Sequence, residues 1–271
     1  MTTKANNNPT TSVIMTVFNQ EKRLLKAAID SILNQQESDL ELLIVDDGST
    51  EIDCLEILDV YKKNDSRVKI IRNNKNEGIT HSLNKAILLT KGVYIARMDS
   101  DDISLPDRFA KQLSYLKKYN LDLIGSNCFF IDINDNMIGG KNVTAPKSFQ
   151  RKLMYGNFFT HSTFFGTRKI FLEMYNKKFT RSQDYEFLLR VASKKYKLGY
   201  LQDQVLKYRF SAKSISSKKA KSQEWFAIKA RWYAIRYYNY NPFYLLYLLR
   251  ALLIFLVPYK MKVFIINNII Q

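Results

Sequence analysis

Three carboxylates follow the apolar run 93–98 almost without interruption: Asp99, Asp101 and Asp102. Carboxylates this close repel one another, which raises their pKa, and a hard divalent cation removes that penalty. Mg²⁺ and Mn²⁺ prefer a few carboxylates together with phosphate oxygens. The segment is therefore a candidate cation site. The alternative is a solvated turn in which Asp102 or Ser104 caps the next helix.

A fourth carboxylate, Asp184, falls in the first turn of an expected helix whose apolar face contains Phe187, Leu188 and Val191. The helix dipole favours the ionised form of an acid in this position. An ionised carboxylate at a helix start that faces a cleft can act as a general base. Helix capping alone explains the same residue.

Asp46 and Asp47 end another apolar run, 40–45, and lead into a Gly-Ser pair. The chain contains neither of the two common glycine-rich phosphate motifs. Two acids at a strand end suit hydrogen-bond donors, such as a ribose hydroxyl or a base N–H. The alternative is a turn in which Asp47 or Ser49 caps the following helix. His161, flanked by aromatic residues, is expected to be a half-buried histidine with its hydrogen bonds satisfied.

The elements that must position these residues alternate along the chain. Apolar runs predict strands, and apolar residues at helical spacing predict helices. The expected strands are 12–18, 40–45, 68–71, 93–98, 121–126 and 128–133, and the expected helices are 19–34, 52–63, 80–90 and one opened by Pro106. This order predicts an α/β fold with a mixed, mainly parallel sheet and flanking helices, which binds ligands beyond the carboxyl ends of its strands.

Composition excludes several classes of protein. Of the 271 residues, 46% are hydrophobic and 13% aromatic, so the chain can bury a core and is not disordered throughout. With 9 Gly and 5 Pro it is not collagen-like or of low complexity. Cys54 and Cys128 lack metal-ligand spacing and are too few for a disulfide scaffold, which fits a reducing compartment. The polar segment 1–10 is not a signal peptide and is predicted to be a disordered leader.

The net charge of +17 is concentrated at one end of the chain. Residues 205–271 hold twelve Lys and Arg and one acid, Glu224, for a net charge of +11. Such an excess attracts nucleic acid, an anionic membrane surface or an anionic small substrate. The asymmetry predicts a basic C-terminal region, 217–271, attached to a domain of ordinary charge.

The same region is apolar, since residues 243–257 carry Arg250 as their one charge before Pro258. A helix over this range spans roughly 22 Å at about 1.5 Å per residue, which is short of the roughly 30 Å hydrocarbon core of a bilayer. We therefore expect an interfacial helix held at an anionic surface by flanking residues such as Lys260 and Lys262. A terminal helix packed on the domain, or in a homodimer, is the alternative.

Taken together, these residues resemble the inverting glycosyltransferases of family 2, which have the GT-A fold. The resemblance covers about residues 11–216, with motifs in matching order and spacing. The stretches that carry it are SVIMTVFNQEKRLLKAAIDSILNQ, LELLIVDDGST, NEGITHSLNKAI, GVYIARMDSDDISLPDRF, SQDYEFLLRVA and YRFSAKSIS. It implies a catalytic domain over 11–216, a nucleotide-sugar donor, usually a UDP-sugar, and a divalent cation, Mn²⁺ or Mg²⁺.

The resemblance also assigns the donor site. Asp47 matches the residue whose carboxylate contacts the uracil, and Thr16, Phe18 and Asn19 match the first donor-binding loop. Ser100 belongs with the donor-binding positions.

The metal and the catalytic base follow from the same comparison. Asp99 and Asp101 match the D-x-D pair, with Asp101 the stronger candidate for the metal ligand. Asp184 matches the catalytic base, although Gln183 replaces the usual Glu, and Arg190 ends that motif. Three further positions fall where the family closes over the diphosphate: Tyr208, Arg209 and Ser214.

The implied reaction moves one sugar to a hydroxyl of a saccharide or lipid-linked acceptor. The Q-x-x-R-W signature of processive synthases is absent, because Ile228 stands where the Gln is required. The resemblance further implies a cytoplasmic enzyme, peripheral on the inner face of the cell membrane, in cell-surface polysaccharide assembly.

Two other classes of protein remain as alternatives. A basic nucleic-acid-binding protein is suggested by Trp225 and Trp232 among Lys and Arg. It leaves the carboxylates unexplained, since they repel phosphate unless a metal is present, and no nucleic-acid partner is expected. A nucleotidyltransferase on a related sheet requires a basic loop after the first strand, and residues 17–20 do not provide one.

Overall fold

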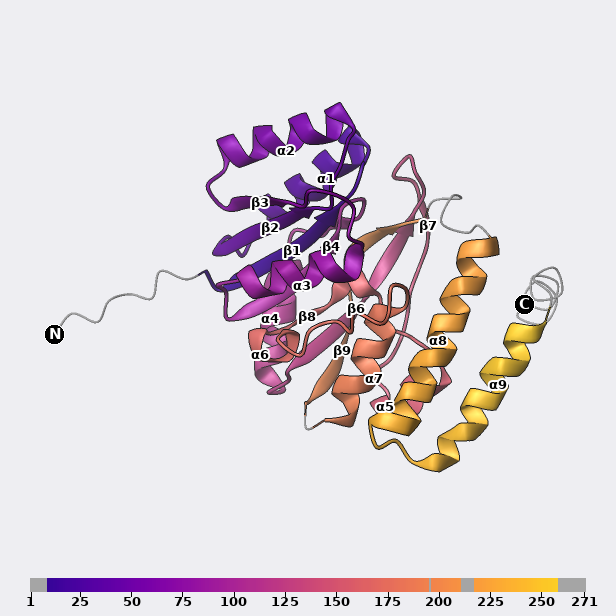
Figure 1. The fold of residues 1–271 in the computed structure, drawn as a ribbon. Coiled ribbons are helices and arrows are strands. Elements are labelled where there is room, and N and C mark those ends of the chain that lie inside the picture. The colour runs from indigo at the N-terminus through magenta and orange to yellow at the C-terminus, as the bar shows by residue number, and fades with distance from the viewer. Residues whose placement is uncertain (1–8, 195, 211–216, 258–271) are drawn as a thin grey trace.

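A computed structural model describes residues 9–194, 196–210 and 217–257. Predictions that concern residues 1–8 of the leader 1–10, Ser214 and the end of the chain from Pro258 onwards lie outside the described residues. The predicted α/β architecture is confirmed: a twisted sheet is flanked by helices on both faces (Figure 1).

The sheet runs in the order β3-β2-β1-β4-β8-β6-β9-β5, with β7 paired to β6. The strands are β1 (Thr11–Val17), β2 (Leu40–Asp46), β3 (Val68–Arg72), β4 (Tyr94–Asp99), β5 (Ile103–Ser104), β6 (Leu123–Ile131), β7 (Met137–Gly140), β8 (Phe165–Thr167) and β9 (Leu198–Arg209). The four strands β1 to β4 pair in parallel, and every antiparallel pair within the described residues involves a later strand.

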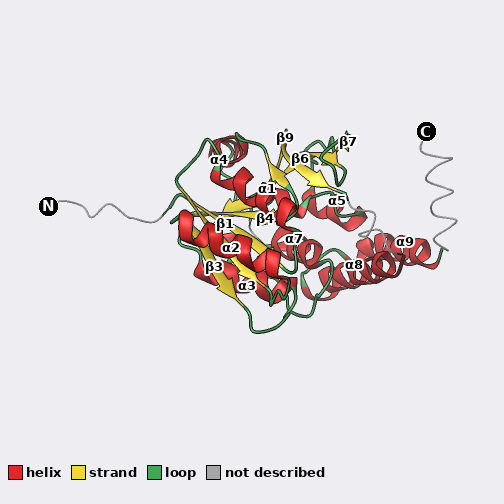
Figure 2. Cartoon of the chain, turned by 90° about the horizontal axis from the view of Figure 1, so that it is seen from above, coloured by secondary structure: helices red, strands yellow, loops and turns green. Residues whose placement is uncertain are grey.

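Helices pack on both faces of this sheet, as Figure 2 shows from above. They are α1 (Lys22–Leu33), α2 (Ile52–Asn64), α3 (Ile79–Leu89), α4 (Arg108–Lys118), α5 (Phe149–Tyr155), α6 (Arg168–Phe171), α7 (Gln183–Ser193), α8 (Ser217–Tyr237) and α9 (Leu245–Leu256). Alternate side chains of β1 lie on opposite faces of the sheet. Val13 and Met15 pack in the core under α1, α2 and α4, whereas Ile14 packs in the core under α3, α5 and α7.

The strand register brings the predicted site segments to one edge. Thr16 lies opposite Asp99, and Val17 lies opposite Asp46. The carboxyl ends of β1, β2 and β4 therefore meet, as the alternation of elements predicts.

Two expected strands, 121–126 and 128–133, form the single strand β6 in the structure. The pairing of β6 with β9 shifts register on either side of Asn127. A bulge at this residue keeps the two apolar halves in one strand, and the Asn127 amide is satisfied by hydrogen bonds with the Val143 and Gln202 backbone.

The last two described helices form a hairpin at the side of the molecule away from β3 (Figure 1). Helix α8 packs on α7, with Ala230 and Ala234 fully buried. Farther along the chain, the Tyr240 hydroxyl donates to the Leu189 carbonyl of α7 at 2.9 Å. Helix α9 returns along α8, and most of its large apolar side chains are exposed. A boundary between catalytic domain and C-terminal region at residue 216 stays a prediction.

Candidate active site

Asp99 ends β4 and is tied to a buried arginine of the same strand. The Arg97 guanidinium, which is almost fully buried, forms a two-pronged ion pair with the Asp99 carboxylate. The Ser162 hydroxyl donates to Asp99 Oδ2 at 2.6 Å. Both oxygens of Asp99 are thus occupied by protein donors, which leaves its two acidic neighbours as the freer ligands for a cation.

Those neighbours, Asp101 and Asp102, lie on the turn after β4. One oxygen from each of Asp99, Asp101 and Asp102 falls within a cluster 4.8 Å across. Asp102 is buried: its Oδ1 accepts from the Arg209 backbone N–H at 2.8 Å, whereas its Oδ2 has no hydrogen-bond partner among the described residues. A buried carboxylate oxygen without a partner is costly unless a ligand satisfies it. The cluster therefore fits Mg²⁺ or Mn²⁺, which take carboxylate oxygens. The family resemblance assigned Asp99 and Asp101 to the metal and did not include Asp102. The possibility that Asp102 caps the next helix is wrong, because α4 begins at Arg108 after Asp107.

Burial and mutual repulsion shift the titration of these acids. Burial, with the neighbouring Asp99 charge second, raises the pKa of Asp101 to about 6. Burial likewise raises the pKa of Asp102 well above its ordinary value, and the charges of Asp99 and Asp101 add to the effect. Without a cation, both carboxyl groups therefore keep their protons to a higher pH than exposed aspartates do.

This shift predicts how pH and metal together affect stability. The Asp101 carboxyl has a higher pKa in the folded than in the unfolded state, so its protonated form stabilises the fold at low pH. This contribution to the free energy of unfolding is lost as pH rises through about 6. The cation binds the ionised oxygens, so Mn²⁺ should raise the Tm more at about pH 7.5 than at about pH 5.5. Thermal unfolding in EDTA and in Mn²⁺ at both values measures this. An Mn²⁺ effect that is equal at both values, or larger at the acid one, would contradict it.

A cavity of about 340 Å³ lies beside the cluster, between the ends of β1, β2 and β4. Thr16, Phe18, Asp47, Ser100 and Asp101 all line it, so the structure brings together most residues of the predicted donor site. Phe18 is half exposed and offers an aromatic face at the cavity.

Asp47 is held rigidly by the chain itself. Its Oδ1 accepts from Asn73 Nδ2 at 2.8 Å, from the Ser82 hydroxyl at 2.8 Å and from the Glu77 N–H at 3.0 Å. Its Oδ2 accepts from the Gly78 N–H at 2.9 Å. Oδ2 is therefore the oxygen with remaining capacity for a ligand donor.

Asn19 does not line the cavity of about 340 Å³. It adopts a left-handed conformation with φ 47°, and its Oδ1 accepts from the N–H groups of Thr50 and Glu51 at 2.7 and 3.1 Å. Its own N–H donates to the Ser49 hydroxyl at 2.9 Å. No side chain caps α2, so the expected cap by Asp47 or Ser49 is wrong; Asn19 instead holds the backbone just before the helix and joins the first loop to the second.

Asp184 lies in the first turn of α7, as predicted, behind Ser182, which takes a left-handed φ of 51°. The Asn157 side chain donates to Asp184 Oδ2 at 2.9 Å and fixes the carboxylate. Burial raises the pKa of Asp184, while hydrogen bonds from the Tyr185 backbone and Asn157 and the charge of Arg97 oppose the rise. The carboxylate is therefore a better proton acceptor than an exposed aspartate.

A larger cavity of about 520 Å³ connects Asp184 with the acidic cluster. Asp99 and Asp184 both line it, together with Lys141, Asn157 and Tyr208. It shares Asp99 and Ile79 with the smaller cavity, so the two hollows meet at the end of β4. No local pattern in the sequence pointed to Lys141 or Asn157, because both act through contacts distant in the chain.

The other predicted residues are placed as follows. Arg209 lines neither cavity: its Nε donates to the Asp101 carbonyl at 2.7 Å, and its Nη2 lies 2.5 Å from Asp135. Arg190 pairs with the buried Glu186 at 2.8 Å and is structural. His161 is satisfied as expected, with Nε2 2.8 Å from the Tyr175 hydroxyl, and burial lowers its pKa well below the ordinary value.

The chain is similar to known proteins in sequence and in fold. The model of the family described as glycosyl transferase family 2 matches residues 12–177. The chain is 31% identical to the uncharacterized glycosyltransferase MJ1057 of Methanocaldococcus jannaschii, over 97% of this chain and 93% of that protein. It is 30% identical to the UDP-Glc:alpha-D-GlcNAc-diphosphoundecaprenol beta-1,3-glucosyltransferase WfgD of Escherichia coli, over 85% and 87% of the two chains.

Among solved structures, the chain resembles residues 1–349 of TarS from S. aureus in complex with UDP-GlcNAc. The TM-score is 0.70 at 16% identity, and the match covers 89% of this chain and 71% of that one. Against the structure of the same fragment alone, the match covers 64% of the TarS chain. This likeness shows the fold, which is the GT-A fold.

Proposed function

Because this chain belongs to glycosyl transferase family 2, we propose that it moves a single sugar from a UDP-sugar to a hydroxyl of a saccharide or lipid-linked acceptor, with inversion at the anomeric carbon. One observation carries the proposal: a cavity lined by Phe18 and Asp47 meets a cavity lined by Asp184 at Asp99. The first has the groups to hold a nucleotide, and the second has a base to activate an acceptor. The name of another relative, the O-antigen biosynthesis glycosyltransferase WbnJ of Escherichia coli, favours a role in polysaccharide assembly.

In the proposed donor site, Phe18 provides a face for the base to stack on, and Asp47 Oδ2 accepts a hydrogen bond from the base. Thr16 and Ser100 line the same cavity and supply hydroxyl groups to the ribose and diphosphate. Asn19 and Arg209 serve this site by fixing its loops, one at the start of α2 and the other at the Asp101 carbonyl.

In the proposed reaction, Asp184 removes the proton of the acceptor hydroxyl as that oxygen attacks the anomeric carbon. Asn157 holds the carboxylate in place, so less freedom is lost when the acceptor binds. A Mn²⁺ or Mg²⁺ ion held by Asp101 and Asp102, with Asp99 beside them, would neutralise the charge that develops on the diphosphate leaving group. Direct displacement inverts the configuration.

The experiment that tests the proposal is a panel of UDP-sugars and GDP-sugars, each with Mn²⁺ and with EDTA. Donor hydrolysis and the rise in Tm are measured for each nucleotide sugar. We expect one UDP-sugar to be hydrolysed and to raise the Tm, and both effects to require Mn²⁺. Protection by GDP-sugars, or equal protection in EDTA, would overturn the assignment of donor or metal.

We further propose that the enzyme is cytoplasmic and binds the inner face of the cell membrane through α9. Within the described residues, no helix has both the length and the apolar character needed to cross a membrane. Helix α9 instead exposes a stripe at helical spacing, with Leu246, Leu253 and Leu256 at 68%, 67% and 74% exposure. A continuous apolar face beside a cationic chain segment is typical of a helix that lies in the membrane interface.

The stripe makes a prediction for membrane binding. Replacing Leu246 and Leu253 together by Ser should lower the partition onto vesicles of anionic phospholipid by at least about tenfold. Burial of each leucine side chain in the membrane contributes roughly 1.5–3 kcal/mol to the free energy of binding. Co-sedimentation of the full chain measures this. An unchanged pellet fraction would contradict membrane binding through α9. If the pellet fraction is unchanged and the variant instead changes its oligomeric state, the stripe forms a homodimer interface.

A further inference from the structure

Lys141, which directly follows β7, lines the larger active-site cavity and has no carboxylate partner there. Its Nζ donates to the Thr160 hydroxyl at 3.2 Å, and this is its one side-chain hydrogen bond within the described part of the chain. That part includes every Asp and Glu of the sequence, and none of them forms an ion pair with Lys141. Since an ammonium group has three N–H donors, two remain for a ligand.

The position of Lys141 removes part of its side chain from water. Burial lowers the pKa of the ammonium group, while the neighbouring Cys128 and Asp184 oppose the shift. A cation that loses water without gaining a counter-ion is unfavourable, and an anionic ligand offsets this cost. A charge-assisted hydrogen bond is also stronger than one to a neutral hydroxyl. Lys141 therefore favours a ligand with a negative group over a neutral one.

One short segment connects Lys141 with the proposed base. Asn157 donates to Asp184 Oδ2 at 2.9 Å, and three residues later the Thr160 hydroxyl accepts from Lys141. Three residue steps span at most roughly 11 Å of chain. A saccharide with a hydroxyl at Asp184 can therefore extend to Lys141. The cavity proposed for the nucleotide is separate from this place, because Lys141 does not line it.

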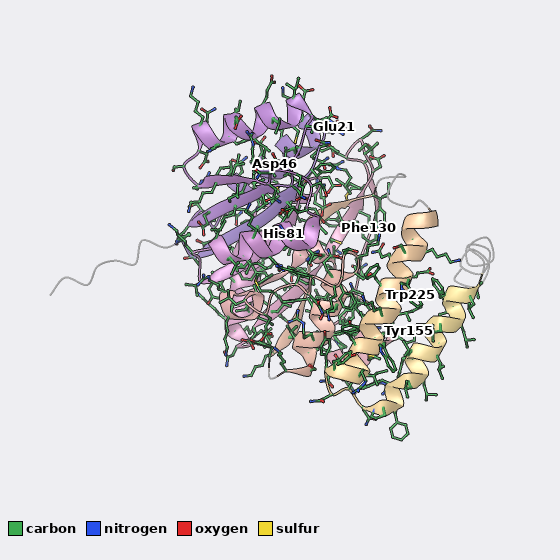
Figure 3. All side chains as sticks on the ribbon, viewed as in Figure 1. Glu21, Asp46, His81, Phe130, Tyr155 and Trp225 are labelled. Atoms are coloured by element: carbon green, nitrogen blue, oxygen red, sulfur yellow. The ribbon has the colours of Figure 1, made fainter. Side chains whose placement is uncertain are left out.

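Aromatic rings form another wall of the same cavity. Phe130, near the end of β6 and labelled in Figure 3, pairs in the sheet with Tyr208 of β9. Phe210 packs edge to face on both rings, with centroid distances of 4.9 and 5.2 Å, and is 39% exposed. All three side chains line the cavity. Such rings offer a broad apolar surface on which the C–H face of a sugar ring can pack.

We infer that the larger cavity selects an acidic saccharide as the acceptor, with a sugar carboxylate paired to Lys141 and a sugar hydroxyl at Asp184. The aromatic wall packs against the sugar rings. This selection rests on the proposed transfer at Asp184 and extends it by naming the class of acceptor and the side chain that recognises its charge. Lys141 contacts the acceptor away from the reacting atoms, so it determines specificity and is not a catalytic residue.

The test measures the binding of simple methyl glycosides to the full chain by isothermal titration, with saturating UDP and Mn²⁺ to fill the donor cavity. The methyl glycosides of glucuronate, galacturonate and mannuronate are compared with those of glucose, galactose and mannose. We expect at least one uronate to bind at least about tenfold more tightly than its neutral counterpart, because it gains a charge-assisted hydrogen bond. Equal binding within all three pairs would overturn the inference.

Lys141→Met removes the charge and keeps an unbranched side chain. It should bring the affinities for the uronate and its neutral counterpart to within about twofold of each other, because the counter-ion is lost. Lys141→Arg should keep the preference. Lys147→Met is the matched control, since Lys147 is exposed on the same connection between β7 and α5 and lines neither active-site cavity. Equal effects of Lys141→Met and Lys147→Met would contradict the role of Lys141.

Two further measurements identify the source of the carboxylate and separate the two proposals. Lys141→Met should leave the ratio of affinities for UDP-glucuronate and UDP-glucose unchanged. A change in that ratio would place the carboxylate on the transferred sugar and overturn the inference. Donor hydrolysis is measured on the unmodified chain: its absence for every nucleotide sugar contradicts the transferase, whereas hydrolysis without a preference for a uronate contradicts only the acidic acceptor.

Discussion

The Asp184→Asn variant is expected to lose sugar transfer by about 10²–10⁴-fold and to keep its affinity for UDP. The amide has the shape of the carboxylate but cannot take the proton of the acceptor hydroxyl. The Asn157 partner at 2.9 Å and the start of α7 remain, so the fold should be unaffected. Turnover with saturating donor and a titration of UDP measure the two quantities on the same protein.

Two further variants sharpen this result. Asn157→Ala removes the hydrogen bond but keeps the base, so it should cost less than Asp184→Asn. Asp203→Asn removes an acid of β9 that pairs with Lys111 on the surface and lines neither active-site cavity, and it should leave turnover unchanged. If Asp184→Asn loses UDP affinity as much as turnover, the residue is part of the donor site and is not the base.

The Asp101→Ala variant is expected to abolish the dependence of UDP binding on Mn²⁺ and to lower turnover by roughly 10³-fold. A cation at a leaving group supplies several kcal/mol of stabilisation in the transition state, and about 4 kcal/mol corresponds to that factor. Asp101 is the critical member of the cluster because both oxygens of Asp99 are held by Arg97 and Ser162. The UDP affinity is titrated in Mn²⁺ and in EDTA.

A matched control for this loss of charge is Asp59→Ala on α2, since Asp59 pairs with Arg72 and lines no active-site cavity. It should preserve the Mn²⁺ dependence of UDP binding. The removal of a repelling buried acid should also raise the Tm of Asp101→Ala above that of the wild type in EDTA at neutral pH. Unchanged Mn²⁺ dependence in Asp101→Ala would refute its role as a ligand.

The parallel half of the fold could be predicted because its signals are local. Strands β1 to β4 are short and mostly apolar, and a helix separates each from the next, so the strand ends had to meet at one edge. The later half could not be predicted in the same way. The bulge at Asn127 joins two expected strands into β6, and the pairing of β6 with β8 and β9 depends on contacts far apart in the sequence.

The candidate site likewise contains residues that could be predicted from local signals and residues that could not. Asp47, Asp99, Asp101 and Asp184 stand at predicted strand ends or helix starts, and the structure brings them to adjoining cavities. The residues that hold them were not visible in the sequence. Arg97 looks like one more member of a buried strand, and Asn157 lies in an irregular segment with no motif. Only burial and hydrogen bonds in three dimensions reveal what these two side chains do.

The separation of the cavities has a kinetic consequence. The donor cavity shares no lining residue, among the described residues, with the cavity of about 310 Å³ that Asp184, Gln223 and Arg231 line beside α8. An acceptor that reaches Asp184 from the side of α8 would not pass through the donor cavity, so neither substrate would block the entry of its partner. The ternary complex can then assemble in either order, and UDP competes with the donor while leaving the site of the second substrate open. Transfer would therefore follow a random sequential scheme.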